Sequence, residues 1–166
     1  DRVSPVGILG AGSRDLNVSP SLSRETILQW LHELRTYQFN EPTRLGEKLL
    51  ALNPSLGENS LIFVLSDLHD PSAIPALKLL GHRHDIVVIP LRDPAEDSIP
   101  GAGFIRGREV ETGREATLSA KKQFTSLQAL TSTLKKASLD HFPVRTDQPF
   151  LASLRLFLKS RNLLSR

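Results

Sequence analysis

The sequence contains no cysteine and no methionine, and only 5% of its residues are aromatic. The absence of cysteine excludes a disulfide scaffold, a zinc–thiolate site and a cysteine nucleophile. No apolar run approaches the ~18–20 residues of a membrane-spanning helix, and the first residues do not resemble a signal peptide. Because the chain opens on Asp1 and has no Met, we expect a processed, trimmed or partial chain with further polypeptide upstream.

The composition that remains is typical of one globular domain. The chain has 166 residues, 39% hydrophobic and 23% charged, within the usual size of about 100–200 residues per domain. Its charge is uneven, because residues 1–100 carry a net −4 and residues 101–166 a net +7. A basic tail that binds nucleic acid or an anionic membrane is one interpretation. We favour solvated helices, because the tail has few aromatic side chains to stack on bases.

The first third of the chain predicts a hairpin and two helices. The apolar run 3–11 indicates a buried strand, and residues 15–20 a short partner strand after a turn. Apolar residues at helical spacing predict an amphipathic helix over 24–36, for which Ser23 is a good N-cap. A second, shorter helix is expected to open at Thr43 and to stop before Pro54.

The middle of the chain predicts a parallel sheet. Residues 60–66 (SLIFVLS) form a continuous apolar run, as expected of a strand covered on both faces. Residues 71–81 indicate a helix that ends at a glycine, and residues 85–91 indicate another buried strand. Strand, helix and strand with short connections form a βαβ unit with a right-handed crossover.

The pattern of the sequence changes after Arg92. Turns and a β-hairpin are expected within residues 93–120, followed by a helix over 121–138 and a short strand at 142–145. Thr146 or Asp147 is expected to cap a final helix with Pro149 in its first turn. The buried face of that helix is predicted to hold Phe150, Leu151, Leu154, Phe157 and Leu158. We interpret residues 1–166 as a single domain.

Ligands of a parallel α/β sheet lie at the carboxyl ends of its strands, which directs attention to the residues after the SLIFVLS strand. Asp67 could coordinate a hard cation such as Mg²⁺. Alternatively, Ser66 and Asp67 could cap the next helix and fix the loop, and the residues alone leave both interpretations open. The Thr43 hydroxyl could be a further cation ligand, although N-capping is the expected role of an isolated Thr.

Other motifs are weaker. The segment Gly7–Gly12 (GILGAG) does not supply the third glycine of the dinucleotide-binding fingerprint G-x-G-x-x-G. No helix follows it directly. No Walker motif is present, so any ATPase would be a partner. The turn histidines have no Cys or Glu at zinc-like spacing, and we interpret them as surface residues: His69, His82 and His84.

A series of short motifs runs in order through nearly the whole chain. They are Asp1-Arg2-Val3, Thr43-x-Leu45, Leu65-Ser66-Asp67, Arg83-His84-Asp85, Asp93-Pro94-Ala95-Glu96 and Glu111-Thr112-Gly113. Each is weak alone, but their order and spacing resemble the bacterial von Willebrand factor A-like family known as DUF58. The resemblance implies a Rossmann-like von Willebrand factor type A fold, a mostly parallel sheet flanked by helices, with a metal-ion-dependent adhesion site.

The resemblance also implies which residues hold the metal. Such sites take a DxSxS motif from the first strand, a Thr from a later loop and an Asp at the end of the fourth strand. Thr43 matches the second element and Asp67 the third, with Ser66 and Asp70 as outer-sphere candidates. DxSxS is absent from this sequence, and in the family it precedes the strand at which this chain begins. We therefore expect a truncated domain that lacks its first central strand, leaves sheet edges exposed and binds Mg²⁺ weakly alone.

The function that the resemblance implies is a metal-dependent protein-interaction module without catalysis. Its expected partner is an AAA+ ATPase of the MoxR type, in the assembly or maturation of other proteins. A cytoplasmic location follows, with anchoring to the membrane by an upstream segment. Two alternatives stay open: a Mg²⁺-dependent hydrolase or phosphotransferase that uses Asp67 with His69 or Asp70, and a basic nucleic-acid-binding module.

Overall fold

The computed structural model describes residues 4–13, 16–36, 41–57, 59–94, 104–108, 115–119 and 127–161. Parts of several sequence-based predictions therefore lie outside the described residues. Among them are the start of the first strand at Val3, the start of its partner strand at residue 15, the turns within 95–103, the turn at 111–113 and the first turns of the helix expected from residue 121.

The centre of the molecule is a parallel sheet. β3 (Leu61–Ser66) pairs with β4 (Asp85–Arg92) from Leu61 opposite Asp85 to Ser66 opposite Pro90. On its other side β4 pairs in parallel with two short strands, β7 (Asp140–His141) and β8 (Val144–Arg145). α3 (Ala73–Leu80) connects β3 to β4, so the predicted βαβ unit is confirmed and the fold is Rossmann-like.

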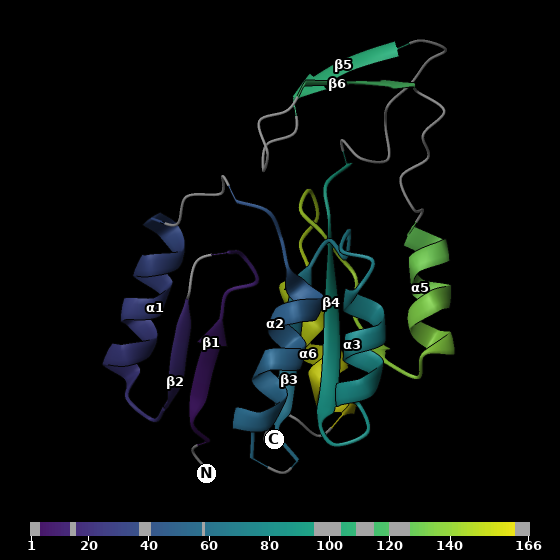
Figure 1. Cartoon of the computed structure of the whole chain (residues 1–166). Helices are drawn as coiled ribbons and strands as arrows, with labels where there is room; N and C mark the ends of the chain where they lie inside the picture. The colour runs from purple at the N-terminus through teal and green to yellow at the C-terminus, as the bar shows by residue number, and fades with distance from the viewer. Residues whose placement is uncertain are drawn as a thin grey trace.

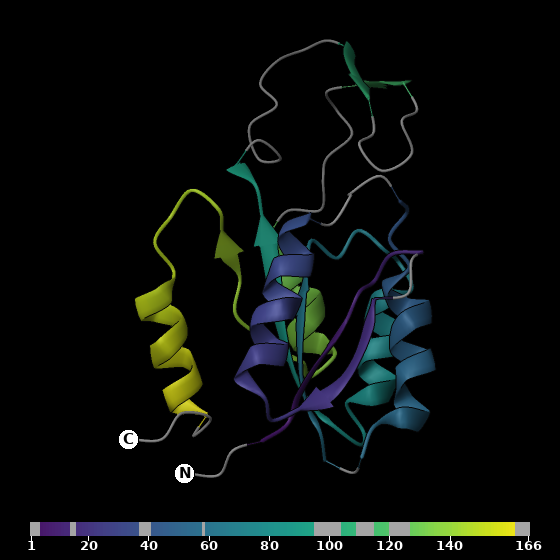
Figure 2. The ribbon, with the colours of Figure 1, turned by 90° about the vertical axis from the view of Figure 1, so that its left-hand side faces the viewer.

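Helices lie on both faces of this sheet (Figures 1 and 2). α2 (Leu45–Leu52), which continues into the short 3₁₀ turn Asn53–Ser55, α3 and α5 (Leu127–Lys136) lie on one face. α6 (Leu151–Ser160) lies on the other. The first face holds the larger core, built from side chains such as Val64, Leu77, Val88 and Leu134. The second face is a smaller cluster in which Val87, Ile89 and Val144 meet Leu154 and Phe157.

The N-terminal hairpin is a separate two-stranded unit. β1 (Val6–Leu9) pairs antiparallel with β2 (Asn17–Ser21), as the sequence predicted. The prediction that the first strand is buried is wrong, because β1 is exposed or half-buried along its length. α1 (Arg24–Thr36) follows and lies beside the hairpin (Figure 1).

α1 forms over the predicted residues, and the cap prediction is confirmed. The backbone N–H of Thr26 donates to Ser23 Oγ at 3.4 Å. Trp30 is buried, whereas Leu28, Leu31 and Leu34 remain exposed. The helical spacing of the apolar residues therefore predicted the helix α1 correctly. The described elements around α1 cover only part of its apolar surface.

A second hairpin forms within residues 93–120. β5 (Phe104–Arg108) and β6 (Glu115–Ser119) pair antiparallel, with Phe104 opposite Ser119 and Arg108 opposite Glu115. Figure 1 shows this hairpin beyond the end of the molecule toward which β3 and β4 run.

Two helix boundaries and the conformation of one cap residue differ from the predicted ones. α2 begins at Leu45 after Arg44 with no side-chain cap, so Thr43 is not its N-cap. Gly81 follows α3 as predicted, but in the right-handed helical conformation (φ −61°), so the position does not require glycine. α6 begins at Leu151, which places Pro149 outside the helix, and the prediction that Phe150 and Leu151 are buried is wrong.

Candidate functional site at the carboxyl edge of the sheet

The loop after β3 turns sharply at Asp67. Leu68 takes the left-handed conformation (φ 59°), while its side chain is buried in the core. Its N–H donates to Ser66 Oγ at 3.0 Å, and the N–H of His69 donates to Asp67 Oδ1 at 3.2 Å. The turn therefore anchors Leu68 inward and leaves Asp67 at the carboxyl end of the strand.

Asp67 is a half-exposed carboxylate that lies beside a histidine ring. Its side chain is 43% exposed, and Oδ2 lies 3.3 Å from His69 Nδ1. The Ser66 hydroxyl lies 3.5 Å from Oδ1, a weak donor geometry. Ser66 and Asp67 thus fix their own loop, but they do not cap α3, whose cap residue is Ser72.

Asp70 ties this loop to the start of α2. Its Oδ2 accepts the backbone N–H of Gly46 at 2.9 Å, across 24 residues of sequence. Its Oδ1 accepts the N–H of Ser72 at 2.8 Å and the Ser72 hydroxyl at 2.6 Å. The carboxylate therefore joins the loop after β3, the first turn of α2 and the entry to α3.

These hydrogen bonds favour the ionised form of the Asp70 carboxyl group. Burial alone would raise its pKa, but hydrogen bonds from the Ser72 side chain and from the backbone of Gly46, Ser72 and Leu45 outweigh it. The pKa of Asp70 is held below its ordinary value of 3.8. A carboxylate that is ionised and occupied in this way is a poor general base, so its role here is to position backbone.

Thr43 lies in the segment that leads into α2, near the same edge of the sheet. The N–H of Arg44 donates to the carbonyl of Ala11, just past β1, at 2.7 Å. The Ser13 hydroxyl donates to Glu41 Oε2 at 2.6 Å. The segment that carries Thr43 is thus held between the turn of the N-terminal hairpin and, through Gly46, the loop of Asp67.

The structure therefore gathers the predicted site residues at one edge. Thr43 is exposed, Ser66 and Asp67 are half-buried, and Asp70 connects the two segments that carry them. Among the residues described, no group of three or more His, Asp or Glu side chains converges as a metal site would. Thr43 and Asp67 would supply a hydroxyl and a carboxylate oxygen, which suits a hard cation but falls short of six ligands.

Sequence reasoning missed the residues that hold the site together. Asp70 was predicted as an outer-sphere candidate or as a catalytic partner of Asp67, and not as a structural residue, although Asp-Pro-Ser is a turn signal that places a carboxylate near following backbone N–H groups. Gly46 went unnoticed. A Cβ there would lie 2.7 Å from the backbone carbonyl of Ser72, so α2 and the loop approach too closely for any other residue.

One histidine interpretation is wrong. His84 is buried, and its Nε2 lies 3.3 Å from Asn53 Oδ1, between the end of α2 and the start of β4. His69 and His82 are exposed. His84 is therefore a structural residue at the end of the sheet opposite to Asp67.

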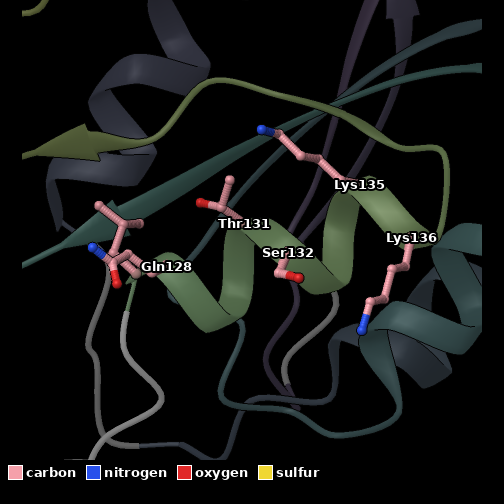
Figure 3. Close-up of a pocket in the computed structure, with 6 residues that line it drawn as sticks. Gln128, Thr131, Ser132, Lys135 and Lys136 are labelled. Carbon is pink, nitrogen blue, oxygen red and sulfur yellow. The ribbon is translucent and has the colours of Figure 1, made fainter.

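Two further features bear on the alternative functions. A shallow hollow of about 490 Å³ follows the outer side of α5 (Figure 3), and every residue that lines it comes from this one helix. Its lining residues are Leu127, Gln128, Thr131, Ser132, Lys135 and Lys136.

In the basic third of the chain, Arg145 pairs with Asp147 at 3.1 Å, and Arg161 pairs with Asp85 and Asp140. Arg161 thus connects the end of α6 to β4 and β7, whereas the Arg145 pair is local to two neighbouring residues.

Comparison with protein families identifies the chain. The model of the family "Protein of unknown function DUF58" matches residues 3–136. The chain belongs to this family, as its ordered motifs indicated. Neither the curated proteins nor the solved structures give a significant match. Among the described residues, no helix has both the length and the apolarity to cross a membrane.

Proposed function

We propose that this chain is the greater part of a von Willebrand factor A-like domain that binds partner proteins through a divalent cation. Thr43 and Asp67 would hold the cation, with Mg²⁺ preferred because both donors are hard oxygens. The observation that carries the proposal is the chain of hydrogen bonds that ends at Asp70. It brings the Thr43 segment and the Asp67 loop to the carboxyl edge of a parallel sheet, the usual place for ligands.

The described residues supply only part of a ligand set. The resemblance places the other protein ligands on a DxSxS element that is not in this sequence. A cation held there would keep one position for a carboxylate of the partner, so binding makes and breaks no covalent bond. Residues 1–166 are accordingly expected to bind Mg²⁺ only weakly, in contrast to a chain that includes DxSxS.

The family resemblance supports a partner of the MoxR type. Relatives often lie beside genes for such AAA+ ATPases and often have membrane helices upstream. We therefore propose that the domain works with a MoxR-type ATPase at the cytoplasmic face of the membrane, in the assembly or maturation of other proteins. Both oxygens of Asp70 already accept hydrogen bonds from Gly46 and Ser72, so this carboxylate is a poor candidate for proton transfer at this edge.

Calorimetric titration with Mg²⁺ tests the metal site. We expect a dissociation constant in the millimolar range or weaker for residues 1–166, and at least ~100-fold tighter binding by a chain that includes DxSxS. Asp67→Asn should abolish the tight binding with the fold intact, whereas Asp147→Asn should leave it unchanged. Tight binding by residues 1–166, or tight binding that survives Asp67→Asn, would contradict the proposal.

A further inference from the structure

Helix α2 begins without a capping side chain of its own. Its N-cap residue is Arg44, whose side chain makes no hydrogen bond to the first turn. The side chain that accepts a first-turn N–H comes from another element, because Asp70 Oδ2 accepts the N–H of Gly46 at 2.9 Å. A capping side chain ordinarily bonds the N–H of the second or third helical residue, and Gly46 is the second residue of α2. Asp70 therefore caps α2 from 24 positions along the chain.

The other oxygen of the same carboxylate is occupied as well. Asp70 Oδ1 accepts the N–H of Ser72 at 2.8 Å and its hydroxyl at 2.6 Å. A carboxylate offers about four acceptor positions, and these three hydrogen bonds fill most of them. A cation that bound Asp70 directly would have to displace one of these donors. Asp70 is thus suited to hold the helix and unsuited to be a cation ligand.

The approach of α2 to the loop after β3 is also fixed by packing. A Cβ at Gly46 would lie 2.7 Å from the carbonyl oxygen of Ser72, so only glycine allows the helix and the loop to lie this close. Leu45 and Leu49 of α2 share one buried cluster with Leu68 of the loop. The start of α2 and the loop after β3 are therefore packed as one unit.

This division of roles differs from the one that the sequence predicts. The sequence predicts Thr43 as the cap of this helix and Asp70 as an outer-sphere neighbour of a cation. In the structure Asp70 accepts the first-turn N–H, and Arg44 is the N-cap residue. A hydroxyl oxygen that caps a helix spends a lone pair on a backbone N–H. Capping by Asp70 removes this task from Thr43, which lies two residues before α2.

We propose that Asp70 is a positioning residue of the candidate cation site: by capping α2 from the loop after β3, it sets the place of Thr43 relative to Asp67 without binding the cation itself. The inference rests on the proposed function, because it assigns a role within the same site. It goes further, because it makes cation affinity depend on a side chain that is not a ligand. Polar groups that orient metal ligands from outside typically change metal affinity by about 10–100-fold.

Titration of residues 1–166 with Mg²⁺, followed by the NMR signals of the aspartate side-chain carboxyl carbons, tests the inference. The Asp67 signal should shift and the Asp70 signal should not. In Asp70→Ala, the Mg²⁺ concentration at half of the Asp67 shift should rise ~10-fold. Gly46→Ala disturbs the same contact while keeping Asp70 and should raise this concentration too, whereas Gly57→Ala, where a Cβ meets no atom within 4 Å, should not. Because the shift is read from folded chains, a loss of stability alone does not move it.

A double-mutant cycle shows whether Asp70 acts through Thr43. Thr43→Val and Asp70→Ala should each weaken Mg²⁺ binding ~10-fold, and the double variant should bind no more weakly than either single variant. An Asp70 signal that shifts as far as that of Asp67, an unchanged affinity in Asp70→Ala, or additive losses in the double variant would overturn the inference and leave the proposed function standing. If the wild-type Asp67 signal does not shift, Asp67 is not a ligand, and the inference falls together with the proposed function.

Discussion

Removal of the Asp70 carboxylate should destabilise the domain more than its half-exposed position implies. Asp70→Ala deletes an acceptor for Gly46 N–H at 2.9 Å and for the N–H and hydroxyl of Ser72 at 2.8 and 2.6 Å. The part-buried bond to Gly46 is worth about 1–2 kcal/mol and each solvent-exposed bond to Ser72 about 0.5 kcal/mol. The expected loss is about 2–3 kcal/mol, or a fall of roughly 5–10 °C in the melting temperature.

Urea unfolding followed by circular dichroism measures this loss. Asp147→Ala is the matched control, because Asp147 is an exposed aspartate whose side-chain hydrogen bonds come from Arg145, two residues away, so its loss should leave the transition unchanged. An Asp70→Ala transition within about 0.5 kcal/mol of the wild type would refute the argument that this carboxylate joins α2 to the loop after β3.

The contribution of Asp70 should also depend on pH in a defined direction. Its pKa is lower in the folded chain than the ordinary 3.8, so the unfolded chain binds the proton more readily. The stabilisation is therefore present above the unfolded pKa and is lost as the pH falls through the folded value. The difference in unfolding free energy between wild type and Asp70→Asn should be constant near neutral pH and shrink below about pH 4.

Two further substitutions test the packing around the site. Gly46→Ala should cost about 1–3 kcal/mol, because its Cβ would lie 2.7 Å from the Ser72 carbonyl, whereas Gly57→Ala meets no atom within 4 Å and should be nearly neutral in the same urea titration. Leu77→Ala should cost about 2–5 kcal/mol because Leu77 is fully buried, and Leu79→Ala, which is largely exposed, should cost far less by thermal unfolding.

Local patterns predicted the elements well where one physical cause dominates. The apolar run of β3 and the βαβ spacing predicted the parallel sheet, and Ser23 predicted the start of α1. The prediction that β3 is covered on both faces is wrong, because Leu61, Phe63 and Leu65 are exposed. Sequence patterns failed to predict burial where it depends on which other elements pack against a helix or strand. Leu28 and Leu65 are apolar at helix and strand spacing, but no described element packs over them and they are exposed.

The candidate site was predictable only in part. Asp67 could be placed because ligands gather at the carboxyl ends of parallel strands, and Thr43 came from the family resemblance. The bond between Asp70 and Gly46 could not be foreseen, because it joins residues 24 positions apart and depends on how closely α2 approaches the loop. His84 was misjudged for the same reason, since its contact with Asn53 spans 31 positions.

The central claim is that a cation at Asp67 bridges this domain to a partner protein. Its most direct test is the binding of a chain that includes a DxSxS element to a purified ATPase of the proposed MoxR type, measured by biolayer interferometry in Mg²⁺ and in EDTA, for wild type and Asp67→Asn. Only wild type in Mg²⁺ should bind, with at least ~30-fold weaker binding in the other three combinations. Binding of equal strength in EDTA, or by Asp67→Asn, would contradict it.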